Sequence, residues 1–320
     1  MPTNAIFGTG PLGLGVARRL ASSGASVRLV NRSGKADGPE GAEVVAADAT
    51  DSAAVRRACE GAEVVYHCAT AAYGRWAQFL PALMNGIIEG AAATSAKLVY
   101  GDNLYAYGLV DGPIREDLPY RPVGPNTRAR AEVATTLMNA HATGKLRATI
   151  GRASDFYGPF ARQSTAGDSI FGRAVAGKPA QVLGDPDVPH TYTFIDDFAA
   201  GLVTLGESDE ALGHVWHTPS AATVSTRRFV EMVFAKIAQP ARFRPAPRLA
   251  ITLLALFSPP MAAVKETLYQ SDHPWVVDDS KFTRAFGSRT TPHEQAIEQT
   301  LAWFRSGCSG TPARGPSSPH

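Results

Sequence analysis

The chain has 320 residues, of which 44% are hydrophobic and 19% are charged, a composition typical of a globular protein large enough for two coupled domains. Its formal charge of +2 gives no strong field of one sign, so we expect neither a nucleic-acid nor a membrane partner. No group of His, Cys or carboxylate residues has metal-ligand spacing, so we expect no metal site. Cys59 and Cys68 lie in apolar surroundings and suit buried thiols in a reducing cytoplasm.

Neither a secretion signal nor a membrane span is expected from the sequence. The apolar run at residues 4–8 is too short for a signal peptide. Leu249–Phe257 is under half of the roughly 20 residues needed to cross a bilayer. We therefore expect a soluble, cytoplasmic protein. Residues 306–320 are rich in Ser, Gly and Pro and are expected to be disordered.

Short apolar strands alternate with helical segments through the first half of the chain. The expected strands are Asn4–Phe7, Ser26–Val30, Glu43–Ala47, Glu63–His67 and Lys97–Tyr100, and the expected helices are Leu12–Ser22, Asp51–Ala58 and Trp76–Ala93. Strands that are apolar on both faces and separated by helices indicate a parallel sheet covered on both sides. The pattern predicts an α/β fold with a doubly wound Rossmann sheet.

The second half of the chain is less regular. A helix is expected at 128–142 and a strand at 147–150. Two Gly- and Pro-rich loops follow at 157–167 and 184–190, and two further helices at 196–205 and 226–237. Interleaved loops and helices are typical of a smaller, C-terminal substrate-binding lobe. We predict a dinucleotide-binding domain at 1–155 and a substrate-binding lobe at 156–305, with later segments free to return to the sheet.

A glycine-rich turn follows the first expected strand. Its residues are Gly8, Thr9, Gly10, Pro11, Leu12 and Gly13, which fit G-x-G-x-x-G. The first glycine permits the tight turn, the second lets backbone N–H groups approach a pyrophosphate, and the third lets helix and strand pack closely. The turn opens a helix and a second strand follows, so we predict dinucleotide binding. A glycine-rich turn without a ligand is the alternative.

The end of the second strand indicates which dinucleotide is bound. An NAD enzyme usually carries Asp or Glu there for the ribose 2′-OH, whereas this strand ends Asn31-Arg32-Ser33. No carboxylate repels a 2′-phosphate, and the forked guanidinium of Arg32 suits one. We predict NADP(H) as the preferred cofactor, with NAD(H) as the second choice and a solvated loop cation as the alternative role of Arg32.

With these motifs in place, the sequence resembles the extended short-chain dehydrogenase/reductase family, the NAD-dependent epimerases and dehydratases. The resemblance covers the chain to about residue 305. Its segments in this sequence are Val99-Tyr100-Gly101 with the turn to Gly108, Arg152-Ala153-Ser154-Asp155-Phe156-Tyr157-Gly158-Pro159, Phe194-Ile195-Asp196-Asp197 and Asp279-Ser280-Lys281 followed by Phe286-Gly287. The resemblance implies that Asp48 meets the adenine and that Ala69, Thr70 and Ala71 lie against the cofactor.

Two features depart from the family pattern. The glycine motif is one residue tighter than the usual T-G-x-x-G-x-x-G. Family members also use a Tyr that exchanges a proton with the substrate and a Lys four residues later, yet none of the nine tyrosines here has such a Lys. The resemblance places Gly124 at the Tyr position, Arg128 at the Lys position and Asn103 at the Ser position. The usual proton-transfer residues are missing.

Other residues must then supply the proton. The candidates lie after strands of the sheet or in the second lobe: Asp102, Asn103, Tyr105, Tyr107, Arg128, Tyr157 and His190. Arg128 is also a candidate for binding the nicotinamide ribose, although it cannot titrate near neutral pH. Packing is the alternative role for each tyrosine, turn formation for Asp102, and a surface position without function for His190.

These observations predict an NADP(H)-dependent oxidoreductase or epimerase that acts on a small organic carbonyl or alcohol. A non-redox cyclase, isomerase or dehydratase on the same fold is one alternative, and a dinucleotide-sensing regulatory protein is another. The resemblance also implies a homodimer, paired through helices such as 76–93 and 128–142.

Overall fold

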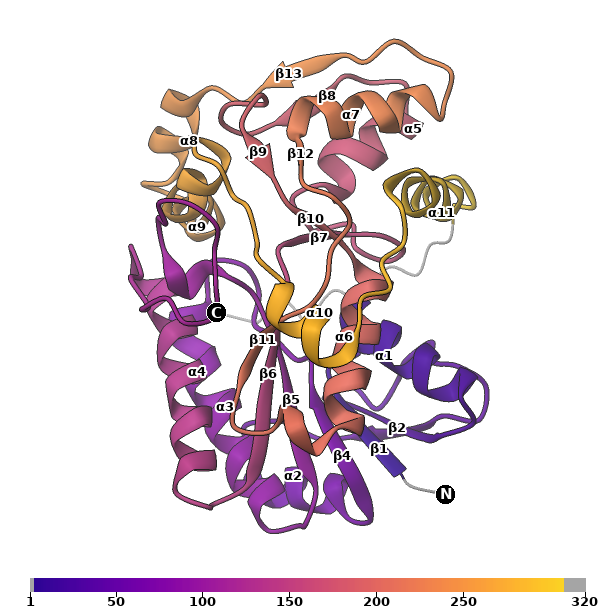
Figure 1. Ribbon diagram of the computed structural model, residues 1–320, viewed down its shortest axis with the longest axis vertical. Coiled ribbons are helices and arrows are strands. Elements are labelled where there is room, and N and C mark those ends of the chain that lie inside the picture. Colours follow the sequence, from indigo (N-terminus) through magenta and orange to yellow (C-terminus); the bar gives the residue numbers. More distant parts are fainter. Residues whose placement is uncertain (1–2, 308–320) are drawn as a thin grey trace.

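A seven-stranded, wholly parallel sheet forms the centre of the computed structural model, which describes residues 3–307 (Figure 1). The strand order is β11-β6-β5-β4-β1-β2-β3. The bounds are β1 Thr3–Phe7, β2 Ser26–Asn31, β3 Glu43–Ala46, β4 Ala62–His67, β5 Lys97–Asp102, β6 Arg147–Arg152 and β11 Val215–His217. The order reverses at β1, so the carboxyl ends of β1 and β4 lie beside the crevice where α/β sheets bind ligands. The predicted Rossmann fold is confirmed.

Helices cover both faces of this sheet (Figure 1). On one face α1 (Pro11–Ser22) packs along α6 (Ile195–Glu207) over an apolar cluster that includes Ile6, Leu29 and Leu202. On the other face lie α2 (Ser52–Cys59), α3 (Trp76–Ala92) and α4 (Pro125–Ala142), over a second cluster. The strands are buried on both faces, which explains their nearly continuous apolar sequences.

Two helix starts show how the sequence fixes local structure. At α2 the Asp51 carboxylate accepts hydrogen bonds from the N–H groups of Ala53 and Ala54, at 2.9 and 3.2 Å. α4 begins at Pro125, three residues before the predicted start at Arg128. The prediction was wrong there because Pro is favoured in the first helical turn, and because the Thr127 hydroxyl accepts from the N–H of Gly124 at 3.0 Å.

Residues 195–217 return from the second half to complete the sheet. α6 packs against α1, and β11 then pairs in parallel with β6, from Val215 beside Ile150 to His217 beside Arg152. α10 (Ser280–Phe286) packs on β11. The sheet is therefore built from both halves of the chain.

The second lobe consists of three small two-stranded sheets and short helices around a separate aromatic core. Its elements are β7 Asp155–Tyr157, η2 Gly167–Gly172, α5 Arg173–Val175, β8 Ala180–Val182, β9 Pro189–His190, β10 Tyr192–Phe194, β12 Val224–Ser225, α7 Thr226–Ala235, β13 Phe243–Pro245, α8 Arg248–Leu254, α9 Pro259–Thr267, η4 Leu268–Ser271 and α11 His293–Arg305. The pairs are β7 with β10, β9 with β12 and β8 with β13. Phe171, Phe229 and Phe234 are fully buried in the core of this lobe.

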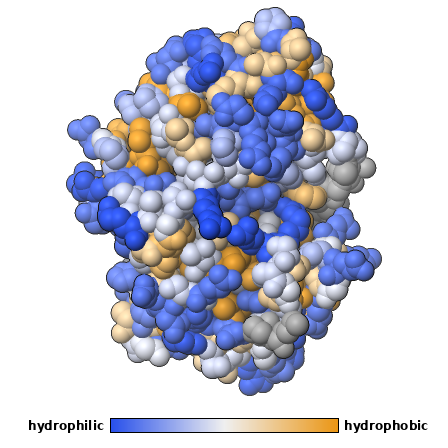
Figure 2. Space-filling view, turned by 45° about the vertical axis from the view of Figure 1, so that its right-hand side comes forward, coloured by the Kyte–Doolittle hydropathy of each residue, from blue (hydrophilic) through white to orange (hydrophobic). Residues whose placement is uncertain are grey.

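On the face shown in Figure 2, hydrophilic residues predominate and hydrophobic residues form separate patches. Between residues 3 and 307, no helix is long and apolar enough to cross a bilayer. Of the tail expected to be disordered, 306–320, all but the first two residues lie outside the described part of the chain.

Candidate functional site

The loop between β1 and α1 has the geometry of an anion cradle. Gly8 has a φ of +99°, and a Cβ there would lie 2.5 Å from the backbone nitrogen of Ala69. A Cβ at Gly13 would lie 1.8 Å from the Gly8 carbonyl oxygen. At Gly10, by contrast, a Cβ would meet nothing within 4 Å. Since no side chain caps α1 and its first turn holds no acidic residue, this open end fits a phosphate group.

The turn after β2 is held together by Asn31. Its amide nitrogen donates to Thr9 Oγ1 and to the Lys35 carbonyl, both at 2.8 Å, while its oxygen accepts from the Ser33 N–H at 3.0 Å. Arg32 is exposed on this ordered turn. A hydrogen bond from the Thr50 backbone N–H, helped by the charge of Arg32, lowers the pKa of Asp48 below its usual value. Arg32 and Asp48 therefore lie along one edge.

The loop after β4 connects this cradle to the rest of the site. Ala69 lies against Gly8, and the Thr70 hydroxyl accepts from the guanidinium of Arg130 at 3.1 Å. The Ala71 carbonyl accepts from the Trp76 indole N–H at 3.2 Å. These contacts tie this loop to α4 and to the start of α3.

A buried group of charges lies at the carboxyl ends of β5 and β6. The guanidinium of Arg130 donates to Tyr100 Oη at 3.0 Å and to Asp102 Oδ1 at 3.2 Å. Nε of Arg152 donates to Asp102 Oδ2 at 3.0 Å, and a second Arg152 nitrogen donates to Tyr120 Oη at 2.9 Å. Both carboxylate oxygens of Asp102 are thus engaged by buried arginines.

Tyr105 begins a second buried network that joins the two lobes. Its phenol donates to Asp155 Oδ1 at 2.9 Å, and Asp155 Oδ2 lies 3.2 Å from Nε2 of His190. The side-chain amide of Gln270 donates to the same phenol at 3.4 Å. Burial, reinforced by the Asp155 carboxylate, holds the pKa of Tyr105 well above its usual range. At neutral pH this phenol is therefore protonated. His190 is buried, so the alternative of a surface position was wrong.

The remaining candidates after β5 and β6 have structural contacts. Asn103 Oδ1 accepts from the backbone N–H of Tyr105 at 3.1 Å and so shapes the turn. Tyr107 is buried with its hydroxyl 3.0 Å from Nε2 of His217, and burial raises its pKa to about 12. Tyr157 lies in the core of the second lobe, stacked on Phe171, with its hydroxyl 3.2 Å from Nδ1 of His293.

Around the Tyr105 network, several buried polar atoms have no protein partner among the described residues. They are Ser154 Oγ, Tyr269 Oη, Gln270 Oε1 and Trp275 Nε1. Trp275 pairs its backbone with the strand that carries His190, and its ring meets that of Tyr269 edge-on, with centroids 5.7 Å apart. Because buried polar atoms normally find partners, this group is suited to hold a polar molecule.

The family model described as "NAD dependent epimerase/dehydratase family" matches residues 8–217, from the first glycine of the cradle to the end of β11. The chain belongs to this family. One curated relative, the dTDP-glucose 4,6-dehydratase of Xanthomonas campestris pv. campestris, is 25% identical over 213 residues, which are 63% of this chain and 55% of that protein. The chain thus spans about half the length of the curated relatives it matches. The predicted family is confirmed.

Solved structures of the epimerase/dehydratase family have the same fold. A dTDP-glucose 4,6-dehydratase from Bacillus anthracis in complex with NAD superposes with a TM-score of 0.79 at 13% identity, covering 96% of this chain and 98% of that one. A UDP-glucuronic acid 4-epimerase from Bacillus cereus with UDP-glucuronic acid and NAD gives 0.78 at 16% identity, covering 95% and 99%. The epimerase Mth375 from Methanothermobacter thermautotrophicus gives 0.80 at 18% identity, covering 96% and 93%.

Gly124, which the family resemblance places at the position of the proton-transferring Tyr, faces the side chain of Glu266. A Cβ on Gly124 would lie 2.4 Å from Cδ of Glu266, which reaches across from α9. The Glu266 carboxylate accepts from the backbone N–H of Thr127 at 2.6 Å and from the side-chain amide of Asn126 at 3.1 Å. Glu266 therefore caps α4 where the family places its tyrosine. Arg128, at the Lys position, is exposed.

Several residues of the site were missed in the sequence. Arg130 was overlooked because the family pattern pointed to Arg128, two residues away on the opposite face of α4. The sequence feature that could have indicated Arg130 is a cation on a helix face whose other residues are small or apolar. Glu266 and Gln270 lie far along the chain from the sheet strands, after β11 ends at His217, and no local pattern marks them. Trp76, whose ring lies 4.2 Å from the Arg130 guanidinium carbon, was read only as a helix start.

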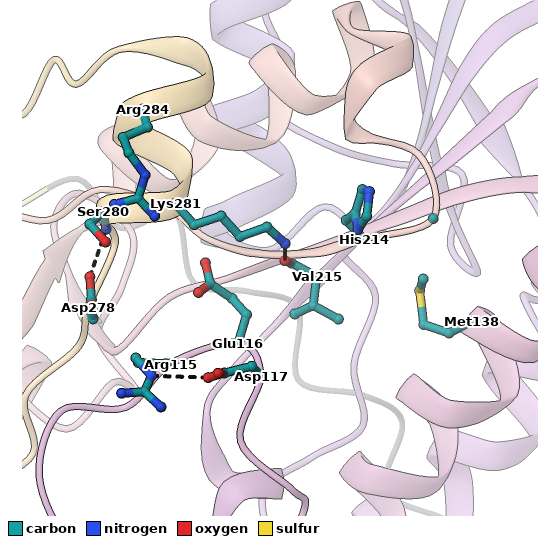
Figure 3. A pocket seen from close by; sticks show the side chains of 11 residues that line it. Arg115, Glu116, Asp117, Met138, His214, Val215, Asp278, Ser280, Lys281 and Arg284 are labelled. Carbon is teal, nitrogen blue, oxygen red and sulfur yellow. Dashed lines mark hydrogen bonds and ion pairs between the residues drawn. The ribbon is translucent and has the colours of Figure 1, made fainter.

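A cavity of about 440 Å³ lies elsewhere, at the β11 edge of the sheet (Figure 3). None of the site residues predicted from the sequence lines it. Its charges are partly satisfied: Arg115 pairs with Asp117 at 3.1 Å, and Lys281 donates to the Val215 carbonyl at 2.8 Å. Cations and carboxylates are mixed around it, which favours no single kind of charged ligand. Among residues 3–307, no three His, Cys, Asp or Glu side chains form a metal-binding group.

Proposed function

We propose that this chain is an NADP(H)-dependent oxidoreductase or epimerase that acts on a small organic carbonyl or alcohol. The single observation that carries the proposal is the Tyr105–Asp155–His190 network, with distances of 2.9 and 3.2 Å, at the carboxyl edge of a sheet whose phosphate cradle is intact. The cradle supplies a place for the cofactor, and the network supplies a proton where the family's Tyr and Lys are missing.

The cradle residues Gly8–Gly13 would hold the pyrophosphate, and Asp48 would face the adenine. Arg32 supports a preference for NADP(H), because it is exposed beside the ribose position and no carboxylate in Asn31–Ser33 opposes a 2′-phosphate. The solved relatives named above contain NAD, so the preference is a property proposed for this chain alone. When bound, the nicotinamide supplies or accepts a hydride.

Tyr105 is the proposed proton donor to the substrate oxygen. Loss of its proton would leave a phenolate beside the Asp155 carboxylate, which is unfavourable while Asp155 is charged. His190 Nε2 lies against the second oxygen of Asp155. Transfer of a proton from His190 Nε2 to Asp155 Oδ2 would neutralise this carboxylate and so stabilise the Tyr105 phenolate, which would recover its own proton from solvent after the reaction. Asp102, by contrast, keeps Arg130 and Arg152 in position.

The substrate is proposed to bind beside this network, where Ser154, Tyr269, Gln270 and Trp275 offer buried polar atoms without protein partners. Tyr73 and Trp76 add aromatic surface next to Tyr105. The relatives are named for sugar nucleotides, so dTDP-glucose, UDP-glucose and UDP-glucuronic acid are the first substrates to test.

A non-redox function, as an isomerase, cyclase or dehydratase, is the second candidate. It is favoured by the Glu266 carboxylate at the family's Tyr position, 2.4 Å from where a Gly124 Cβ would lie, because the usual redox apparatus cannot be rebuilt there. In this case Tyr105 and His190 would act as acid and base on a bound substrate, and the dinucleotide would be structural.

The two candidates are separated by following the hydride. The full chain is incubated with the sugar nucleotides and with small ketones, in the presence of NADPH deuterated at the transferred position. An oxidoreductase transfers deuterium to the product with stoichiometric loss of NADPH absorbance, and an epimerase shows no net consumption. Full turnover by protein stripped of cofactor would overturn the redox proposal and favour the second candidate.

A further inference from the structure

The outer face of α8 and the turn after it expose an unusual group of large apolar side chains. Leu249, Leu253, Leu254, Leu256 and Phe257 are 53–87% exposed, five such residues within nine positions. Leu249 and Leu253, four positions apart, share one face of α8, whereas Ile251 faces inward and is 5% exposed, and Leu256 and Phe257 lie in the turn that follows the helix. We name these five residues the α8 face. A cluster of this kind marks an interaction surface more often than a scatter of single residues does.

The same segment concentrates positive charge. Residues 232–265 contain no Asp or Glu but five cations: Lys236, Arg242, Arg244, Arg248 and Lys265. The other 286 residues carry 26 cations and 29 acidic residues. The net charge of +2 is therefore the sum of a basic segment at 232–265 and a slightly acidic remainder of the chain. Arg244 and Lys265 are exposed and form no ion pair within residues 3–307. Arg248 and Lys236 pair with Asp272 and Glu298.

The position of the α8 face makes it accessible to a flat surface. α8 lies at the outer edge of the second lobe, beside α9, away from the sheet (Figure 1). Prolines bracket it on both sides, at 245, 247, 259 and 260, so the helix is short and is held across the surface. Seven residues cannot span a bilayer, but an apolar helix face with flanking cations suits its interface.

We propose that the α8 face docks on the surface of a membrane that contains anionic lipids. The leucines and Phe257 would enter the boundary between headgroups and acyl chains, and Arg244 and Lys265 would meet the anionic headgroups. A second copy of the chain fits less well, because a symmetric contact through this face would oppose the same cations on both copies. The proposal does not depend on the proposed function.

Vesicle co-sedimentation of the full chain tests this docking. Phosphatidylcholine vesicles with phosphatidylserine are expected to bind the chain, and pure phosphatidylcholine vesicles to bind it more weakly. Leu253→Asp with Phe257→Asp should weaken binding at least about tenfold, because burial of such side chains is worth an order of magnitude or more in partitioning. Val175→Asp, an exposed apolar residue on α5, is the matched control and should bind as the wild type does.

Charge is tested with a second matched pair of variants. Arg244→Gln with Lys265→Gln should reduce binding to the anionic vesicles, whereas Arg56→Gln with Arg57→Gln, exposed on α2, should not. All these positions are exposed, and circular dichroism checks that each variant folds. No binding to anionic vesicles, or binding unchanged by the α8 variants, would overturn the proposal. So would light scattering that shows a dimer dissociated by Phe257→Asp, since the face would then be covered by a second copy.

Discussion

The carboxylate of Glu266 occupies the space in front of Gly124, so that a Cβ at position 124 would lie 2.4 Å from Glu266 Cδ. The same carboxylate accepts from the Thr127 backbone N–H at 2.6 Å, close to the start of α4. A residue from α9 thereby satisfies a helix end that the sequence of α4 leaves without an acidic cap. Gly124 leaves the space that this carboxylate fills, since a side chain at position 124 would collide with it.

Glu266→Ala should lower the free energy of unfolding by about 0.5–2 kcal/mol, because it removes the cap of α4. Urea denaturation measures the change. Lys265→Ala, an exposed neighbour on the same helix, is the control and should stay within about 0.5 kcal/mol of the wild type. Equal effects of the two substitutions would contradict the capping role.

Arg32→Ala should weaken NADP(H) binding by about 10- to 100-fold and leave NAD(H) binding nearly unchanged. The reason is the loss of a charged hydrogen bond to the 2′-phosphate, typically about 1.5–3 kcal/mol. Titration calorimetry with both cofactors gives the two affinities. Arg56→Ala, an exposed cation on α2, should change neither. A variant at position 32 that kept the wild-type preference would remove the basis for the NADP assignment.

Tyr105→Phe should lower kcat by about 100-fold or more, the scale of lost general acid catalysis. Tyr107→Phe is its control, because that tyrosine is also buried after β5 but bonds to His217. We expect Tyr107→Phe to keep most of kcat and to lose about 1 kcal/mol of stability. His190→Gln should reduce kcat, because it removes the ring nitrogen that lies against Asp155 Oδ2. Similar kcat values for the two Phe variants would point to a proton source elsewhere.

Acid should destabilise the protein through two buried histidines. Burial, with the charges of Arg130 and Arg152 respectively, lowers the pKa of His67 and of His217 to about 3. Below pH 6.5 the unfolded chain therefore binds protons that the folded chain excludes, and stability falls as the pH drops from about 6.5 to 3. Each histidine contributes up to about 1.4 kcal/mol per pH unit in this window.

Urea denaturation between pH 5 and 6.5 measures how the free energy of unfolding changes with pH. Most carboxylates titrate below this range and contribute little to the slope. His67→Gln should make it shallower by about one proton equivalent, whereas His273→Gln, at an exposed position, should leave it unchanged. A slope that does not differ between His67→Gln and the wild type would mean that His67 is protonated in the folded protein.

The cradle could be predicted from the sequence because its demands are local. Gly8 and Gly13 are required by backbone contacts within a few residues and by one neighbouring strand, and the G-x-G-x-x-G spacing records those contacts directly. The alternation of strands and helices similarly predicted the sheet, since strands buried on both faces must be apolar throughout.

The residues proposed to transfer the proton could be predicted only in part. Tyr105 and His190 were candidates, but their link through Asp155 depends on how β7 and β9 meet in the second lobe. Arg130 lies two positions after Arg128, which is about 200° further around the helix. Arg128 is therefore exposed to solvent, whereas Arg130 lies in the buried charge cluster. Glu266 is 139 residues from its partner Thr127, and Gln270 is 165 residues from its partner Tyr105, so neither leaves a pattern near the residue it contacts.

The return of β11 has a consequence for how this protein is made. A nascent chain that has emerged only as far as β6 would present that strand as an open edge, because its partner, Val215–His217, is synthesised more than 60 residues later. The intervening residues include β7 to β10 of the second lobe, so the sheet cannot close before these strands have left the ribosome. Neither half is a separable module, and a fragment that ends near residue 155 should aggregate through its uncovered edge.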